Sequence, residues 1–225
     1  MKIAVLFSGR INDDMQQYEN IMNNLVSHHH ADFFICYQKG SNPEVVKNVI
    51  SLYQPKKIME NDEIYFPVDK YPSAPETKPH TVMCMYKSRY LLRNLFQEYI
   101  EETNPEYDIV ISTRMDMFYE DNIMLGEYQL PHIQQNTIFV PEHWDCRGIN
   151  DQIAVGNQHT ILNYLNVYDL LYGMLESGVF INPEYILMCY LRYKNQDVLR
   201  HPAKYHNERR FNELTNSTPP PLPLP

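Results

Sequence analysis

The alternation of short apolar runs with helical segments is the sequence feature that most limits how this chain can fold. Runs rich in β-branched and aromatic residues are separated by segments whose apolar residues recur at helical spacing. The expected strands lie at 3–7, 32–37, 56–60 and 107–113, and the expected helices lie at about 13–26, 43–53 and 81–102. A strand–helix–strand repeat places its strands parallel to one another. The sequence therefore predicts a single α/β, Rossmann-like domain with a mainly parallel central sheet and helices on both faces.

The rest of the chain is less regular. Residues 61–80 contain four prolines and are expected to form an irregular loop. Later elements are expected as strands at 137–141, 152–156 and 197–200 and as helices at about 158–175 and 183–195. From Asn212 the composition turns polar and then proline-rich up to Pro225, which is typical of an extended linker or tail. We therefore expect the domain to span 1–211, and 212–225 to be a tail or a link to further domains.

Composition and charge exclude several classes of function. The chain has 225 residues, 44% of them apolar, which is enough for one domain with its own core. Its formal net charge is −9 and it has no long block of Lys or Arg, so nucleic acid is not an expected partner. Four widely spaced cysteines without a C-x-x-C pair are typical of reduced thiols. With no signal-like or membrane-spanning stretch, the sequence predicts a soluble, cytoplasmic protein that is not inserted in a membrane.

Tyrosine is frequent, with 18 residues, and this frequency allows two interpretations. Tyrosines often line sites for sugars and nucleotides, because the ring stacks while the hydroxyl donates or accepts hydrogen bonds. The same residues can equally supply the aromatic part of an ordinary core. The sequence leaves both interpretations open.

The strongest strand, 107–113, leads directly into a charged segment. Arg114 and Asp116 follow it, at the edge of the sheet where ligands bind in parallel α/β proteins. A carboxylate at this position could hold Mg²⁺ or Mn²⁺, which prefer oxygen ligands. Arg114 could contact a phosphate or form an ion pair with Asp116. A strand-end ion pair without a further role is the alternative interpretation.

This segment resembles the metal-binding strand end of GT-A glycosyltransferases. Those enzymes usually carry Asp-x-Asp, whereas here Arg114 stands in the place of the first Asp. Further similar blocks are Ser8-Gly9-Arg10 after the first strand, Tyr86-Lys87-Ser88-Arg89 on the long helix, Asn150-Asp151-Gln152 followed by Ala154-Val155-Gly156-Asn157, and Asn182-Pro183-Glu184. The similarity spans roughly residues 2–200. Within this family, the sequence resembles the N-terminal domains of chlorovirus glycosyltransferases, which add sugars, among them rhamnose, to a major capsid protein.

The resemblance implies an enzyme that transfers a sugar, L-rhamnose or a hexose, from a UDP-sugar to a glycan acceptor, such as one on a viral capsid glycoprotein, with help from Mn²⁺ or Mg²⁺. Asp116 would bind the metal, and His201 or His206 would supply a further ligand. Asp151 would be the second catalytic carboxylate, although its side chain could equally cap a turn. Nucleotide binding would fall to Ser8, Gly9, Arg10, Arg89 and Arg114.

Arg89 is expected to contact the phosphates in preference to Lys87, because residues two apart on a helix do not face the same ligand. Trp144 could stack on an acceptor sugar or fill the core. Two other functions remain open. A sugar nucleotidyltransferase is disfavoured because such an enzyme is expected to have a long glycine-rich loop after the first strand. Here that loop is only Ser8-Gly9-Arg10. A non-catalytic nucleotide-sugar or glycan-binding module is disfavoured by the carboxylate pair of Asp116 and Asp151.

Overall fold

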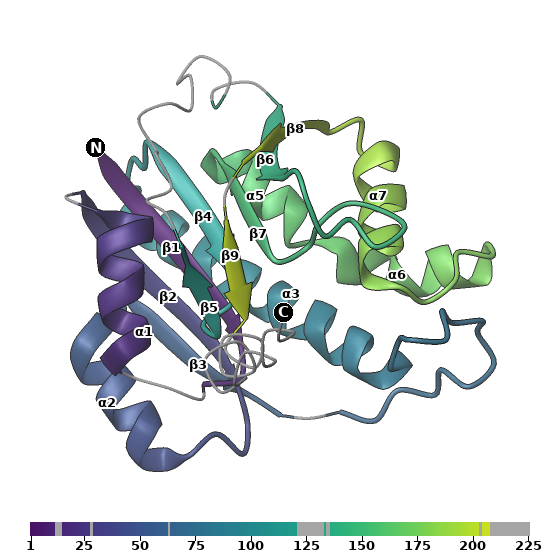
Figure 1. Cartoon of the computed structure of the whole chain (residues 1–225), viewed down its shortest axis with the longest axis horizontal. Helices are drawn as coiled ribbons and strands as arrows, with labels where there is room; N and C mark the ends of the chain where they lie inside the picture. Colours follow the sequence, from purple (N-terminus) through teal and green to yellow (C-terminus); the bar gives the residue numbers. More distant parts are fainter. Residues whose placement is uncertain are drawn as a thin grey trace, which may run out of the picture.

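The central sheet has seven strands in the spatial order β3-β2-β1-β4-β7-β6-β8 (Figure 1). A computed structural model describes residues 1–11, 15–27, 29–62, 64–120, 133, 136–202 and 204–207, without the side chains of 206 and 207. The strands of this sheet are β1 Lys2–Gly9, β2 His30–Gln38, β3 Lys57–Asn61, β4 Ile109–Thr113, β6 Thr137–Pro141, β7 Ile153–Gly156 and β8 Asp197–His201. The predicted proline-rich tail, from 212, lies outside the described residues.

The sheet is mainly parallel, as the sequence predicts. Strands β3, β2, β1 and β4 all run in the same direction. Only β7 is reversed within this sheet, since it pairs antiparallel with both β4 and β6, and β6 pairs in parallel with β8. The expected α/β fold class is therefore confirmed, and the carboxyl ends of β2, β1 and β4 meet at one edge.

Helices cover both faces of the sheet. They are α1 Met15–Asn20 with the continuing π-helical turn η1 Ile21–Val26, α2 Pro43–Tyr53, α3 Pro79–Thr103, α5 Gln158–Tyr164, α6 Val167–Glu176 and α7 Pro183–Tyr193. Alternate residues of β1 divide the core between the two faces. Ile3 and Val5 pack with the cluster under η1 and α2, whereas Ala4 and Leu6 pack with the cluster under α3, α6 and α7.

Two local features differ from the sequence-based expectation. The helix expected at 158–175 is two helices, α5 and α6, which meet at Leu165 and Asn166. Asn166 stands at the N-cap of α6, a place that asparagine favours over a helix interior. In addition, a short antiparallel pair joins β5 Met117–Tyr119 to β9 Tyr205–Asn207. Strands of three residues are too short to show an alternating pattern, so the sequence did not predict them.

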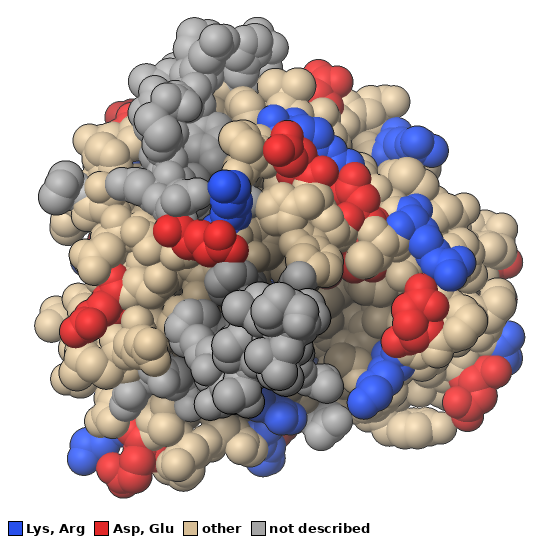
Figure 2. Space-filling view, viewed as in Figure 1, with Lys and Arg blue, Asp and Glu red and all other residues tan. Residues whose placement is uncertain are grey.

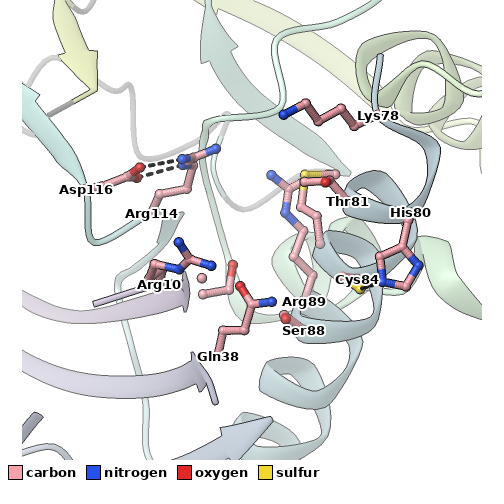
Figure 3. Close-up of a pocket in the computed structure, with 13 residues that line it drawn as sticks. Arg10, Gln38, Lys78, His80, Thr81, Cys84, Ser88, Arg89, Arg114 and Asp116 are labelled. Carbon is pink, nitrogen blue, oxygen red and sulfur yellow. Dashed lines mark hydrogen bonds and ion pairs between the residues drawn. The ribbon is translucent and has the colours of Figure 1, made fainter. Parts of the chain in front are cut away.

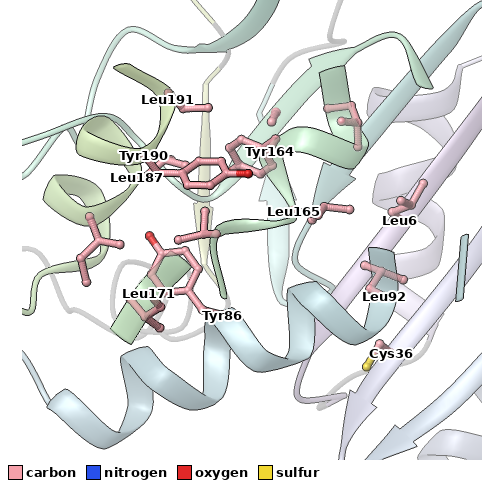
Figure 4. Close-up of a cluster of buried hydrophobic side chains, with 14 of the residues drawn as sticks. Leu6, Cys36, Tyr86, Leu92, Tyr164, Leu165, Leu171, Leu187, Tyr190 and Leu191 are labelled. Carbon is pink, nitrogen blue, oxygen red and sulfur yellow. The ribbon is translucent and has the colours of Figure 1, made fainter. Parts of the chain in front are cut away.

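Three fully buried tyrosines join helices to one another and to the backbone of Asp151 (Figure 4). The hydroxyl of Tyr86 on α3 donates to the Pro183 carbonyl (2.6 Å), and that of Tyr190 on α7 donates to the Asn163 carbonyl (2.9 Å). The hydroxyl of Tyr164 on α5 donates to the Asp151 carbonyl (3.0 Å). Each ring fills the core while its hydroxyl satisfies a backbone acceptor, so these three tyrosines have a structural role.

The surface carries mixed charges on the face shown in Figure 2. Lys and Arg side chains are interspersed there with Asp and Glu, and no broad patch of one sign is seen. In the part of the chain that the structure describes, no helix is both long enough and apolar enough to span a membrane.

Candidate functional site

A pocket of about 490 Å³ lies at the carboxyl ends of β1, β2 and β4 (Figure 3). This is the edge at which open parallel sheets bind ligands, and the volume lies within the usual range for small-molecule sites. The pocket is lined by Ser8, Gly9, Arg10, Gln38, Lys78, His80, Thr81, Cys84, Met85, Ser88, Arg89, Arg114 and Asp116. It thus brings together six residues that the sequence singled out, drawn from β1, α3 and the end of β4.

The loop after β1 lets its backbone border the pocket. Gly9 has φ of +120°, a conformation that residues with a side chain rarely adopt, and a Cβ there would meet no atom within 4 Å. The conformation, and not a lack of space, therefore requires glycine. Ser8 is buried and Arg10 is exposed, and both line the pocket. The structure places Ser8, Gly9 and Arg10 together where the sequence expects a nucleotide.

Arg89 is a buried cation on the pocket wall. Its residue is 3% exposed, and its guanidinium lies over the rings of Tyr86 and Tyr164, at 5.6 and 5.9 Å from their centroids. Its Nη2 group donates to the backbone carbonyl and to the carboxylate of Asp151 (3.0 Å for Oδ2). Nη1 has no hydrogen-bond partner within the described residues. Lys87 does not line the pocket, because its ammonium lies over the Tyr168 ring instead.

Arg114 and Asp116 form a two-pronged ion pair at the opposite side of the pocket (Figure 3). The Nε group of Arg114 donates to Oδ1 of Asp116 (2.7 Å), and its Nη2 group donates to Oδ2. Burial opposes the charge of Arg114, but hydrogen bonding to Asp116 together with the negative charges of Asp116 and Asp151 outweighs it, so the pKa of Arg114 is raised. The nearby Arg89 acts on that pKa in the opposite direction. The two guanidinium groups therefore lie close enough to repel each other.

The segment that follows Asp116 is fixed to the first helix. Asn20 and Asn24, one helical turn apart, both donate to the backbone carbonyl of Tyr119 (3.0 and 2.8 Å), and Asn20 accepts from the Tyr119 amide (2.8 Å). The Tyr119 hydroxyl lies 2.8 Å from the hydroxyl of Thr113 at the end of β4. These contacts hold both ends of the turn that carries Arg114 and Asp116, so the ion pair stands on a defined backbone.

The residues around Asp116 do not fit a divalent cation. Both carboxylate oxygens accept hydrogen bonds from Arg114, so a metal bound to Asp116 would lie close to a guanidinium that repels it. Asp116 is also the sole carboxylate among the lining residues that the structure describes. Over those same described residues, no group of three or more His, Cys, Asp and Glu side chains could hold a metal ion. The lining has four cationic side chains and one carboxylate among the described residues, which suits an anion better than a cation.

The structure describes the side chain of one expected histidine ligand, His201, but only the backbone of the other, His206. His201, at the end of β8, is buried and does not line the pocket. Burial and the neighbouring His143 lower the pKa of His201 to about 4, so its imidazole is neutral at neutral pH. The backbone of His206 pairs with Phe118, two residues after Asp116, but its side chain lies outside the described set. A metal role for either histidine stays a prediction.

Asp151 lies beneath the pocket wall and not on it. The residue is 6% exposed, and its carboxylate accepts the hydrogen bond from Arg89. Its neighbour Asn150 donates to the His143 carbonyl and to the Tyr205 hydroxyl (both 2.6 Å), which fixes this turn against β9. The catalytic assignment of Asp151 stays a prediction. Its observed contacts make it the counter-ion that positions Arg89.

The sequence did not single out several of the lining residues, namely Gln38, Lys78, His80, Thr81, Cys84 and Met85. Thr81, Cys84 and Ser88 are spaced by three and four, which places them on one face of α3 and could have revealed this stripe. Nor did the sequence indicate the environment of Glu184, which lies in the first turn of α7 outside the pocket lining and whose pKa is raised to about 7 by burial and then by the nearby Asp151. Such a shift comes from packing, and nothing in the local sequence indicates it.

Comparison with known proteins gives similarity of fold. No family model matches the sequence, and no curated protein matches it. The structure is similar to that of a candidate nucleotide-diphospho-sugar transferase from Desulfovibrio desulfuricans G20, with 12% sequence identity over 89% of this chain and 79% of that chain and a TM-score of 0.49. It is also similar to apo mouse xyloside xylosyltransferase 1, with 11% identity over 89% and 84% of the two chains and a TM-score of 0.47. Likeness at this identity concerns the path of the backbone and assigns no residue a role.

Proposed function

We propose that this protein is a glycosyltransferase that moves a sugar from a UDP-sugar to a glycan acceptor. The observation that carries the proposal is the pocket at the carboxyl ends of β1, β2 and β4, where Gly9, Arg10, Arg89 and Arg114 converge. Guanidinium groups bind the oxygens of a diphosphate well, because charge-assisted hydrogen bonds are shorter and stronger than neutral ones. A glycine at positive φ lets the backbone approach the nucleotide closely.

In this proposal the chain binds and orients the donor and helps the diphosphate to leave. Arg89 and Arg114, from opposite walls, would stabilise the negative charge that builds up on the nucleoside diphosphate as the bond to the sugar breaks. Asp151 would keep Arg89 in place through its hydrogen bond. The sequence resemblance supports L-rhamnose or a hexose as the sugar, and a glycan of a viral capsid glycoprotein as the acceptor to assay first. The same resemblance supports an enzyme that transfers the sugar over a module that only binds the nucleotide-sugar or the glycan.

A donor panel tests the proposal. Isothermal calorimetry would measure the binding of UDP, UDP-glucose and UDP-rhamnose, and of GDP and dTDP as alternatives, with and without Mn²⁺. Release of UDP from each bound donor would then be followed with and without glycan acceptors. We expect a uridine nucleotide to bind in the micromolar range, on the order of −8 kcal/mol, and UDP to be released. Failure of UDP and every UDP-sugar to bind would refute the proposal, and binding without release or transfer would indicate a binding module.

A further inference from the structure

We propose that Arg114 and Arg89 bind the donor diphosphate directly and take the place of a divalent cation in this site. The inference rests on the proposed function, because it assumes that the pocket binds a nucleoside diphosphate. It goes beyond that function because it names the groups that neutralise the phosphates. Two independent observations carry it, one on each wall of the pocket.

The first observation is the geometry of the Arg114–Asp116 pair. A carboxylate whose two oxygens both accept from one guanidinium already has its charge paired, and that guanidinium repels a second cation. The pair uses the Nε and Nη2 groups of Arg114, so the Nη1 group remains to donate elsewhere. The Arg114 side chain is 39% exposed and lines the pocket, so a ligand can reach it. Asp116 therefore aims Arg114 at the ligand and is a positioning residue.

The second observation is the unpaired Nη1 of Arg89. This atom is buried and has no hydrogen-bond partner among the described residues, although the rest of the guanidinium is held by Asp151 and by two tyrosine rings. An unsatisfied buried donor on a charged group is costly, and native proteins contain few of them. Arg89 lines the pocket, so an anionic oxygen that reached Nη1 through a small shift of the side chain would satisfy the donor.

The charge of the pocket supports the same ligand. Its described lining includes four cationic side chains, Arg10, Lys78, Arg89 and Arg114, against one carboxylate, Asp116. The chain as a whole carries a formal charge of −9, so this concentration of positive charge is local. Like charges held close together destabilise each other unless an anion lies between them. A diphosphate between Arg89 and Arg114 would supply that anion.

The test measures UDP binding to the wild-type protein in excess EDTA and in excess Mn²⁺. If the arginines neutralise the diphosphate, the two affinities will agree within about threefold. Arg114→Gln will weaken binding about 10- to 100-fold in both solutions, because it removes a charge-assisted hydrogen bond. Asp116→Asn keeps one acceptor for Arg114 and loses the second, so it will weaken binding to the same extent in both solutions, and by less than Arg114→Gln does.

A matched control is Arg147→Gln. Arg147 forms an exposed surface pair with Glu76, and neither residue lines the pocket, so the affinity for UDP will stay unchanged. Thermal unfolding of each variant will show that the fold is kept, and the comparison of EDTA with Mn²⁺ needs no variant.

Three results would overturn the inference. UDP binding that requires Mn²⁺ and is lost in Asp116→Asn would restore the metal site while leaving the proposed function intact. Unchanged binding in Arg114→Gln would remove the arginine from the site, again without touching the proposed function. A lack of UDP binding in both solutions would refute the proposed function itself, and the inference with it.

Discussion

At the scale of single residues, the charge at position 114 decides the chemistry of the site. A carboxylate there would repel Asp116 unless a cation lay between them, which is why paired acidic residues suit a metal. Arginine at the same position attracts Asp116 and occupies both of its oxygens. In the proposed site, Arg114 therefore directs a guanidinium at the diphosphate, where an aspartate at this position would suit a cation.

Glu184 gives a residue-scale prediction about pH. Burial and Asp151 raise its pKa from 4.5 to about 7, so the folded protein holds this proton where the unfolded chain has lost it. A raised pKa means that stability falls as the pH rises from about 4.5 through 7. Glu184→Gln removes that loss. We compare the free energies of unfolding of the variant and the wild type, measured in urea at pH 5 and at pH 8. The difference in favour of the variant will be about 1 to 2 kcal/mol larger at pH 8 than at pH 5, allowing for solvent screening.

Glu176→Gln is the control for that measurement. Hydrogen bonds from Lys70 and Tyr71 lower the pKa of Glu176, so both its folded and its unfolded pKa lie below pH 5. Its effect on stability will therefore be nearly the same at the two pH values. An equal effect of Glu184→Gln at pH 5 and pH 8 would contradict the burial of that carboxylate.

At the scale of elements, Gly148 lets the loop before Asp151 pack directly against the backbone at the start of α7. A Cβ on Gly148 would lie 2.0 Å from the carbonyl oxygen of Glu184, a backbone atom that cannot rotate away. The same carbonyl accepts from the Ile149 amide (3.0 Å). We expect Gly148→Ala to lower the free energy of unfolding by about 2 to 3 kcal/mol, because loop and helix must separate.

Gly173→Ala is the matched control. Gly173 lies within α6, and a Cβ there would meet no atom within 4 Å. Alanine in a helix interior is more stable than glycine, so this variant will gain about 0.5 to 1 kcal/mol. Urea unfolding of both variants checks the pair of predictions. A cost for Gly148→Ala no larger than a few tenths of a kcal/mol would show that the loop does not contact α7 as described.

Elements were predictable from the sequence where their pattern is long. Local signals predict β4 and α2. The strand expected at 107–113 is observed as Ile109–Thr113, and α2 is capped by Asn42 and has Pro43 at its first position. The break at Asn166 and the pair of β5 with β9 did not follow. The first is not marked by a capping hydrogen bond, since the Asn166 side chain makes none, and the second joins residues 117–119 to 205–207, a pairing that no local pattern encodes.

At the scale of the whole molecule, topology gathers the site. Parallel strands bring Gly9, Gln38 and Arg114 to one edge although they are far apart in the chain, and this much could be predicted. The place of Arg89 on the long helix was expected, but its pairing with Asp151 was not, because that pairing depends on how α3 packs on the sheet. The sequence left open whether Arg114 would pair with Asp116 or contact a phosphate, and the structure shows the pair.

The central claim is that a nucleoside diphosphate binds between Arg89 and Arg114. A crystal structure of the protein grown with UDP in the presence of EDTA tests it most directly. The account predicts phosphate oxygens within about 3 Å of Nη1 of Arg89 and of the Arg114 guanidinium, with the Arg114–Asp116 pair intact. UDP bound elsewhere, or a diphosphate in this pocket that contacts neither arginine, would contradict it.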